Sequence, residues 1–514
     1  MRAARVAVLP LLLGVMAGAA AAAPRDAVRA WRLSHEAAIV SELAAFSSLP
    51  NLATDSTDVR RNVTALVKML ERRGLTSSVL ASGPWPPAVL GERRVKGAKH
   101  TIVLYAHYDG QPVTPSEWRT PPWEPTLRVR EGAEWRTVPM PPAASAAALD
   151  PEARLFARSA ADDKAPIVAM LAALDALAAT RQAPTVNLKL FFEGEEEAGS
   201  THLPDIVRKY HDRLAADAWL FCDGPIHASR KLQLVFGARG VLGLEMVVYG
   251  PARPVHSGHY GNWAPNPALL LARALAGMRD EDGRVLIDGF YDDVAPITAA
   301  DRAALATLPN VDSEWREELE LGGTEAGDAP LAGRILLPAL NVRGILAGHV
   351  GDQATNAIPA EARASIDFRL VPRQTPAHVR ELVEAHLEKQ GWFVTHDSAT
   401  AEMRRSHPRV VRLMWDQGGY SAYRLPLDAP IARSLRATID EWLGAPVLAV
   451  PMQGGSLPLS ALANAVAAPL VIVPIANHDD DQHSHDENLR LQNLWDGVEL
   501  YAAIMTRLEK HWAR

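Results

Sequence analysis

The sequence contains three adjacent glutamates, Glu195, Glu196 and Glu197, directly after an apolar stretch at residues 186–192. Adjacent carboxylates repel one another, and either solvent or a bound cation relieves that repulsion. An acidic run considered alone is most often a solvated loop. Its chemistry therefore depends on which other side chains the fold brings close to it.

Further histidine and aspartate side chains occupy equivalent places in the chain. Each follows a short apolar run typical of a buried strand, or begins a helix. They are His107 after residues 101–106, Asp223 after residues 218–222, His483 beyond residues 469–475, and Asp162 at the start of an Ala- and Leu-rich helix. Since ligands of open α/β sheets bind at the carboxyl ends of the strands, we expect these groups to converge.

The residue types in this set indicate a metal site. Imidazoles and carboxylates without thiolates suit zinc, with manganese or cobalt as alternatives. In two-metal hydrolases a carboxylate can bridge ions about 3.5–4 Å apart. Such a site also needs one carboxylate that binds no metal and takes a proton from water. Glu196 and Glu197 could divide these two tasks.

The elements that position these residues predict an α/β fold. Strands alternate with helices up to about residue 239, which indicates a mainly parallel sheet flanked by helices. From 240 to 419 the order becomes strand, helix, strand, strand, helix, strand, which is typical of a ferredoxin-like sandwich. The first pattern returns from 420 to 514. We therefore predict a discontinuous catalytic domain, 24–239 and 420–514, with a small lid or dimerisation domain inserted at 240–419.

Three stretches have weaker patterns. Residues 111–150 are rich in Pro, Trp and Ala and are interpreted as a long surface excursion. Residues 292–328 are acidic and show no clear periodicity. Gly454, Gly455 and Ser456 are predicted to form a tight loop.

Composition and the amino terminus limit the cell compartment and the partners. A formal net charge of -7 gives no basic footprint for nucleic acid. Residues 1–23 combine Arg2 and Arg5, an apolar run and small residues, the pattern of a cleaved signal peptide. We expect an exported bacterial protein, periplasmic or secreted, without a stable membrane anchor. Cys222 is the only cysteine, so no internal disulfide forms.

Several short motifs, taken in chain order, resemble the dinuclear-metal peptidases of the M20 family, which includes carnosinase-type dipeptidases, aminoacylases, carboxypeptidases and desuccinylases. The motifs are His107-Tyr108-Asp109, Asp162-Asp163-Lys164, Glu196-Glu197-Ala198-Gly199-Ser200, Asp223 and His483-Ser484. The resemblance extends over nearly the whole chain after the signal region. It implies two divalent metal ions.

The resemblance assigns a ligand set to each ion. One ion would be bound by His107, Asp162 and Asp223. The other would be bound by Asp162, Glu197 and His483, with Asp162 as the bridge. The neighbouring His478 and His485 are interpreted as bystanders.

The resemblance also implies roles around the metal ions. Glu196 would be the general base and acid, and Asp109 would orient His107 through a hydrogen bond. The peptide bond between Asp162 and Asp163 is expected to be cis.

Residues of the inserted domain are also assigned by resemblance. His256 would stabilise the oxyanion, often from the partner subunit of a homodimer. Arg369 would hold the substrate carboxylate, for which a guanidinium is well suited. Asn356 and the loop of Gly454, Gly455 and Ser456 are predicted to line the same pocket.

Together these features predict an exported metallo-exopeptidase that hydrolyses the amide bond of dipeptides or short peptides. Two alternatives stay open. The first is an amidohydrolase acting on N-acyl amino acids, since both reactions cleave an amide next to a carboxylate. The second is a periplasmic metal- or peptide-binding protein without catalysis, which the presence of Glu196 disfavours.

Overall fold

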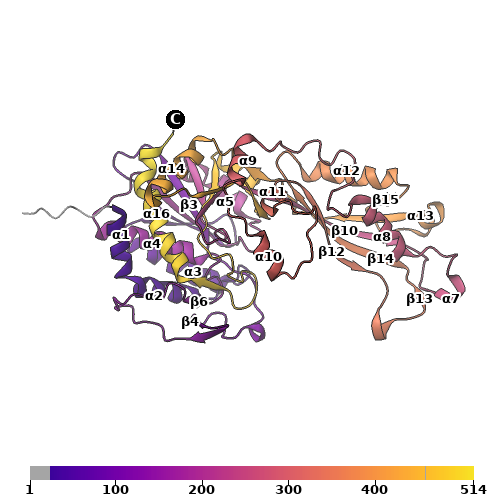
Figure 1. Cartoon of the computed structure of the whole chain (residues 1–514), viewed down its shortest axis with the longest axis horizontal. Coiled ribbons are helices and arrows are strands. Elements are labelled where there is room, and N and C mark those ends of the chain that lie inside the picture. Colours follow the sequence, from indigo (N-terminus) through magenta and orange to yellow (C-terminus); the bar gives the residue numbers. More distant parts are fainter. Residues whose placement is uncertain (1–23, 458, 514) are drawn as a thin grey trace, which may run out of the picture.

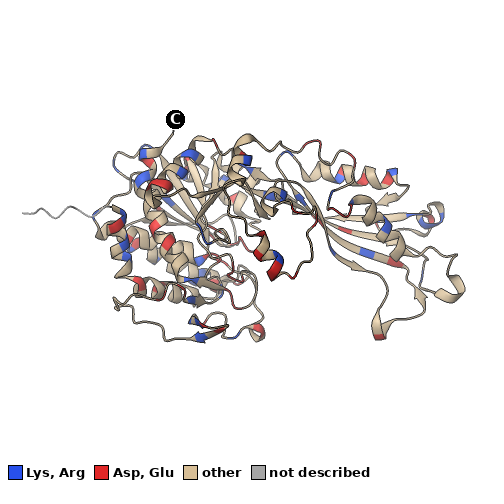
Figure 2. Cartoon of the chain, viewed as in Figure 1, with Lys and Arg blue, Asp and Glu red and all other residues tan. Residues whose placement is uncertain are grey.

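The protein is described by a computed structural model over residues 24–457 and 459–513, and it has a large and a small lobe (Figure 1). The predicted signal peptide, residues 1–23, lies outside the described residues. Among the helices that are described, none is both long enough and apolar enough to cross a membrane. Lys and Arg residues are interspersed with Asp and Glu on both lobes (Figure 2).

The large lobe is built around an eight-stranded sheet. Its four central neighbours are β7, β3, β8 and β20, and they run parallel to one another. In spatial order the strands are β1 (Thr76–Leu80), β2 (Ala88–Arg93), β7 (Asn187–Glu193), β3 (Thr101–His107), β8 (Ala218–Phe221), β20 (Leu470–Ile472), β9 (Gln233–Val235) and β18 (Leu448–Val450).

Both faces of this sheet are covered. On β3, Ile102 and Leu104 belong to one apolar core, whereas the alternate residues Val103 and Tyr105 belong to the core on the opposite face. A strand buried on both faces has a continuous apolar sequence, as residues 101–106 do. The helices over the first face are α1 (Pro24–Leu33), α2 (Glu36–Ser47), α3 (Ser56–Glu71), α4 (Lys164–Ala179), α14 (Pro430–Leu443) and α16 (Leu491–His511); α5 (Leu203–Lys209) and α15 (Leu459–Val466) lie on the other.

Helices α4 and α16 form the centre of the first face. Almost every residue of α4 is buried, so its apolar sequence is matched by burial on all sides. Helix α16, which carries polar residues at intervals, is also mostly buried. A Cβ atom at Gly497 would lie 3.3 Å from Ala169 Cβ and 2.7 Å from Ile475 Cδ1, so only glycine allows α16 to approach this closely.

The small lobe contains the predicted sandwich. Five of its strands lie in the order β12 (Ala339–Leu346), β14 (Glu361–Leu370), β10 (Gly237–Tyr249), β16 (Val410–Trp415) and β15 (Phe393–Thr395). Helices α8 (Pro267–Met278) and α12 (Pro376–Lys389) pack on one face through Leu271 and Val383. Strand β16 was not predicted. Strand β10 continues without a break across the predicted domain boundary at residue 240.

The tertiary structure changes two of the weaker predictions. Residues 111–150 are not only an excursion, because β4 (Thr126–Glu131) and β5 (Glu134–Thr137) form a hairpin. β6 (Arg154–Phe156) and β21 (Asn488–Arg490) complete this hairpin as a four-stranded sheet. The tight loop predicted at 454–456 is instead part of a strand, β19 (Gln453–Ser456), which pairs with β10. The pairing of β19 with β10, and that of the hairpin with β6 and β21, join segments that are distant in the chain, so local sequence does not reveal them.

The weakly patterned stretch at 292–328 also acquires structure. It contains α9 (Ala299–Leu305) and α10 (Asp312–Glu318), and α11 (Leu331–Arg334) follows. These three short helices lie between the two lobes (Figure 1). We call residues 299–335 the bridging segment.

Candidate metal centre

The predicted site residues meet at the carboxyl ends of the central strands. His107 is the last residue of β3 and stands opposite Glu193, the last residue of β7, in the parallel register. The Glu196–Glu197 pair follows β7, and Asp223 follows β8 on the other side of β3. The parallel register therefore delivers groups far apart in the sequence to one edge of the sheet.

Two groups of potential ligands form there and share one residue. His107, Asp162 and Asp223 have ligand atoms within 4.8 Å of one another, and so do Asp162, Glu197 and His483. Asp162 Oδ1 lies 2.9 Å from His107 Nε2, and Asp162 Oδ2 lies 3.2 Å from His483 Nε2. One oxygen of Asp162 thus faces each group. The peptide bond between Asp162 and Asp163 is cis, as the resemblance implied.

The pKa values reflect this concentration of charge. Burial and the charge of Asp162 raise the pKa of Asp223 to about 7. Burial also raises the pKa of Glu196 well above its usual range. Hydrogen bonds to Asp162 and Glu197 raise the pKa of His483 to about 11. The raised carboxyl pKa values show that negative charge is unfavourable in this buried cluster, and bound divalent cations would offset that charge.

Glu196 belongs to neither ligand group. Its Oε2 lies 4.0 Å from His107 Nε2, which leaves the carboxylate facing the centre without entering it. The buried Asp109 explains this placement. Its Oδ1 lies 3.3 Å from His107 Nδ1, and its two oxygens accept hydrogen bonds from the backbone N–H groups of Glu196 and Glu197, at 3.1 and 3.0 Å. Asp109 therefore orients both the imidazole and the glutamate pair.

A buried glutamate links the two halves of the centre. Glu487 Oε2 accepts hydrogen bonds from Arg158 Nη1 at 2.8 Å and from Ser159 N at 2.9 Å. Glu487 Oε1 accepts from the backbone N–H groups of Ala161 and Asp162, each at 3.0 Å. Because Glu487 follows His483 by four residues, this carboxylate fixes the His483 loop against the Asp162 turn.

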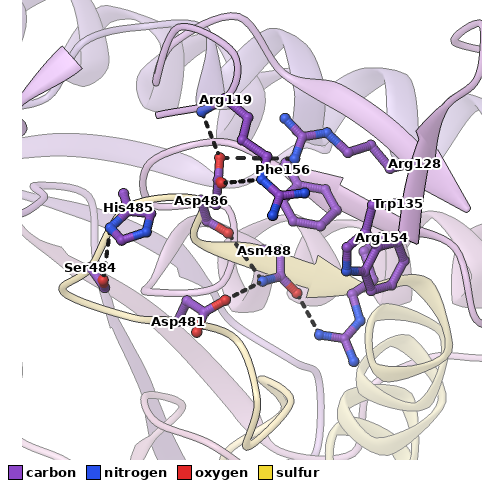
Figure 3. Close-up of a pocket in the computed structure, with 10 residues that line it drawn as sticks. All are labelled: Arg119, Arg128, Trp135, Arg154, Phe156, Asp481, Ser484, His485, Asp486 and Asn488. Carbon is purple, nitrogen blue, oxygen red and sulfur yellow. Dashed lines mark hydrogen bonds and ion pairs between the residues drawn. The ribbon is translucent and has the colours of Figure 1, made fainter. Parts of the chain in front are cut away.

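The outer side of the same loop is held by a second polar network (Figure 3). Asn488 donates to the backbone carbonyl of Asp486 at 3.1 Å and accepts from Arg154 Nη1 at 2.8 Å. The carboxylate of Asp486 accepts from the backbone N–H of Arg119. His485 lies beside Ser484, whose Oγ is 3.4 Å from His485 Nδ1, and both residues line a separate cavity of about 240 Å³. The loop is therefore braced on both sides.

A cavity of about 770 Å³ opens onto the metal centre. Its wall includes Asp162, Glu196, Asp223 and His483, and also the predicted substrate-binding residues Arg369, Gly454, Gly455 and Ser456. Arg369 Nη1 donates to Ser456 Oγ at 2.9 Å, and Arg369 Nε donates to Asp367 Oδ2 at 2.7 Å. His478, interpreted from the sequence as a bystander, also lines this cavity.

His256 and Asn356 lie elsewhere in the chain. His256 is exposed on β11 (Val255–His256), which pairs with β13 (Ala357–Ile358), and Ser257 N donates to Asn356 O at 2.8 Å. Strand β13 and the neighbouring α7 (Ser257–Tyr260) lie at the outer end of the small lobe, away from β3 (Figure 1). A single chain therefore does not bring these two residues into the metal cavity.

Comparison with known proteins agrees with this geometry. Residues 103–507 match the family described as peptidase family M20/M25/M40. The chain belongs to this family. It is accordingly a metal-dependent peptidase, and the predicted M20 resemblance is confirmed.

Two relatives cover most of this M20 peptidase. A Cys-Gly metallodipeptidase of Schizosaccharomyces pombe is 25% identical over 488 residues, which cover 93% of this chain and 94% of that protein. A Beta-Ala-His dipeptidase of Mus musculus is 26% identical over 469 residues, covering 88% and 86% of the two chains.

Solved structures show that the fold is shared. Human carnosine dipeptidase 1 matches with a TM-score of 0.73 and 22% identity, over 95% of this chain and 99% of that one. An M20 metallo-carboxypeptidase from Sulfolobus solfataricus matches with a TM-score of 0.72 and 24% identity, over 92% and 99%. The two-lobed α/β architecture predicted from the sequence is thus confirmed.

The donor set of this M20 peptidase fits metal ions. It offers two imidazoles and three carboxylates, and Asp162 presents one oxygen to each group. Nitrogen and oxygen donors without thiolate suit zinc and the neighbouring divalent metals.

Several residues of the site had no signal in the sequence. Gln111 donates to Glu197 Oε2 at 2.8 Å, and Gln482 donates to Asp162 Oδ2 at 3.3 Å. Glu487 was visible only as one more acid in a loop rich in Asp and His. Their proximity to the ligands is a property of the folded chain, because no spacing rule places a glutamine beside a metal ligand.

Proposed function

We propose that this M20 peptidase is a two-metal dipeptidase. One observation carries the proposal: two ligand groups share Asp162 and open, with the unligated Glu196, onto a cavity whose wall holds Arg369. Both relatives named above are dipeptidases. Two divalent ions, zinc before manganese or cobalt, would be held by His107, Asp162, Asp223, Glu197 and His483. When bound, such ions lower the pKa of a coordinated water and polarise a carbonyl.

The residues of the chain then have distinct tasks. Glu196, on the cavity wall and outside both ligand groups, accepts a proton from the attacking water and delivers it to the leaving amine. Arg369 binds the carboxylate of the substrate's last residue, with Ser456 fixing its guanidinium. Because Arg369 and the metal centre line one cavity, a dipeptide could bind its terminal carboxylate to Arg369 while its amide bond faces the metal centre.

We also propose that the chain works as a homodimer joined through the small lobe. Strand β12 is an edge strand of its sheet, and it exposes Ile345 and Leu346 to 62% and 66%. An exposed apolar edge is a surface suited to pairing. We propose that a second copy docked there supplies its own His256 and Asn356 to the first copy's metal cavity, since neither residue lies in that cavity within one chain. His256 would then stabilise the oxyanion from the other subunit.

Export to the periplasm or the medium stays a proposal that rests on residues 1–23 alone. A fusion of these residues to a reporter that is active only outside the cytoplasm would test it. Reporter activity equal to that of an unfused, leaderless control would refute export.

The decisive experiment compares substrates and one variant. The purified protein is assayed for bound metals and then for hydrolysis of dipeptides and N-acyl amino acids. We expect turnover of dipeptides, and in Glu196→Gln a loss of about 10³-fold or more with unchanged metal content. Substantial turnover in the variant would refute Glu196 as the base. Turnover of N-acyl amino acids alone would favour the amidohydrolase alternative, and metal binding without any turnover would favour a binding protein.

A further inference from the structure

The cavity above the metal centre has an apolar wall that the catalytic assignment does not use. This wall comes from the bridging segment, which contributes Leu308, Pro309, Val311, Trp315, Leu331 and Ile335. The rest of the cavity lining includes the metal centre and the Arg369–Ser456 pair. A bound substrate could therefore place its polar groups at the metal centre and at Arg369 while a side chain contacts the apolar residues of the bridging segment.

The wall is fixed in position relative to Arg369. The neighbouring Arg239 donates hydrogen bonds to the backbone carbonyls of Arg334, Ile335 and Leu337, at 2.9, 2.8 and 2.7 Å. Burial, together with the charge of Arg369, lowers the pKa of Arg239 to about 10. The guanidinium of Arg239, which is influenced by the charge of Arg369, thus holds the end of the bridging segment in place.

Apolar contacts make the same connection. Ile335 packs at the edge of a small core formed by Leu336, Val371 and Met452. A Cβ atom added to Gly454 would lie 3.5 Å from Ile335 Cδ1. Ile335 therefore lies against the strand that carries Ser456, on the side of the cavity where the substrate carboxylate is bound.

Trp315 forms the outer part of this wall. Its helix, α10, stands between the metal cavity and a second cavity of about 1250 Å³, and Trp315 lines both. The helix is tied to α11 because Asp312 Oδ2 accepts a hydrogen bond from Leu331 N at 3.0 Å. The half-buried indole is thus held over the cavity without being packed into a core.

The size of the cavity agrees with a ligand larger than two small residues. About 770 Å³ is in the upper part of the range of roughly 300–1,000 Å³ seen for pockets that hold drug-sized ligands. Apolar lining of such a space favours apolar side chains, because their burial removes apolar surface from water.

We infer that Trp315 and Ile335 are specificity-determining residues that select dipeptides with a bulky apolar carboxyl-terminal residue. This inference rests on the proposed dipeptidase function and names its substrate class. The amide carbon reacts at the metal centre and the terminal carboxylate binds Arg369. The side chain between them, on the last residue, then extends toward Ile335 and the indole.

The test compares full-length metal-bound protein on Ala-Leu, Ala-Phe, Leu-Ala and Ala-Gly. We expect kcat/KM for Ala-Leu and Ala-Phe to exceed that for Ala-Gly by about tenfold or more. Trp315→Ala and Ile335→Ala should each lower kcat/KM for Ala-Leu about tenfold and change Ala-Gly by less than about twofold. Leu319→Ala is the matched control, because Leu319 lines the second cavity but not the metal cavity, and its replacement should leave all four values unchanged.

A binding measurement separates this inference from the proposed function. The affinities of Glu196→Gln for Ala-Leu and Ala-Gly are measured by calorimetry, with this variant alone and combined with Trp315→Ala or Ile335→Ala. These affinities show whether the apolar wall binds the substrate side chain even if no dipeptide is hydrolysed. Absence of hydrolysis by the native protein would refute the dipeptidase function. Parallel losses for Ala-Leu and Ala-Gly, or a loss confined to Leu-Ala, would overturn the wall as a selector of the carboxyl-terminal residue.

Discussion

Replacement of Glu487 by glutamine should weaken metal binding although Glu487 is not a ligand. The carboxylate is fully buried and accepts four hydrogen bonds, from Arg158 and from the backbone N–H groups of Ser159, Ala161 and Asp162. An amide of the same shape presents an NH2 group in place of one oxygen. Because all four partners are donors, the pair of hydrogen bonds at that oxygen is lost.

The size of the effect of Glu487→Gln follows from the burial of the Arg158–Glu487 ion pair. Arg158 is 2% exposed, and removing the charged partner of a buried ion pair costs about 3–5 kcal/mol. Part of this cost falls on the metal centre, because Glu487 fixes the Asp162 turn against the His483 loop. Partners that orient metal ligands typically contribute about 10–100-fold in affinity, or about 1.4–2.8 kcal/mol. We expect the affinity for the weaker-bound zinc ion to fall by that factor.

The assay is zinc competition with a chromophoric chelator, accompanied by urea unfolding of the metal-free protein. Glu441→Gln is the matched control. Glu441 also has several basic partners, Arg507, Lys510 and His511, but these contacts are exposed and join α14 to α16 without involving any residue of the metal centre. Zinc affinity in Glu487→Gln within twofold of the native value, with stability reduced, would show that Glu487 supports the fold only.

Three further predictions concern substrate binding, assembly and pH. Arg369→Lys should raise KM for dipeptides about 10–100-fold with a smaller change in kcat, since lysine cannot form the paired hydrogen bonds of a guanidinium; an equal loss on dipeptide amides would contradict carboxylate binding. Equimolar mixing of the inactive Glu196→Gln and His256→Ala subunits should recover about a quarter of native activity. Half of the dimers are then mixed, and in each of them one of the two sites combines a native Glu196 with a native His256 from the other subunit. No recovery would exclude action of His256 across subunits. Burial raises the pKa of Asp496 to about 6 from its ordinary 3.8. Between these pH values the folded state binds more protons than the unfolded state, so the stability of the fold falls as the pH rises, and the full loss is reached above pH 6. Asp496→Asn should therefore increase the free energy of unfolding at pH 7.5 by about 2–3 kcal/mol, with the gain shrinking toward pH 4 in urea titrations; a gain independent of pH would refute the titration argument.

The convergence of the residues that follow the central strands was predictable because two rules apply to them. A continuous apolar run such as residues 101–106 indicates a strand buried on both faces, and parallel strands end at one edge of the sheet. His107 and Asp223 could therefore be placed together without knowing which strands are neighbours. The structure places both in one potential ligand group.

Other features had no local cause and could not be predicted. Gln453–Ser456 forms a strand only because β10 pairs with it, and its glycines indicated a turn. The bridging segment lacks a strong period because its helices are short, and its end at Arg334 and Ile335 is held by hydrogen bonds from the distant Arg239.

The sequence by itself determined the chemistry of the centre: which imidazoles and carboxylates are present, and that most of them follow predicted strands of a mainly parallel sheet. Tertiary structure decided how those groups are held and what surrounds them. Asp109 and Glu487 orient ligands through hydrogen bonds to backbone from other parts of the chain. Long-range packing also put the bridging segment over the cavity and left His256 at the far end of the small lobe. Residue types fix which bonds can form, whereas distances between remote segments exist only in the folded chain.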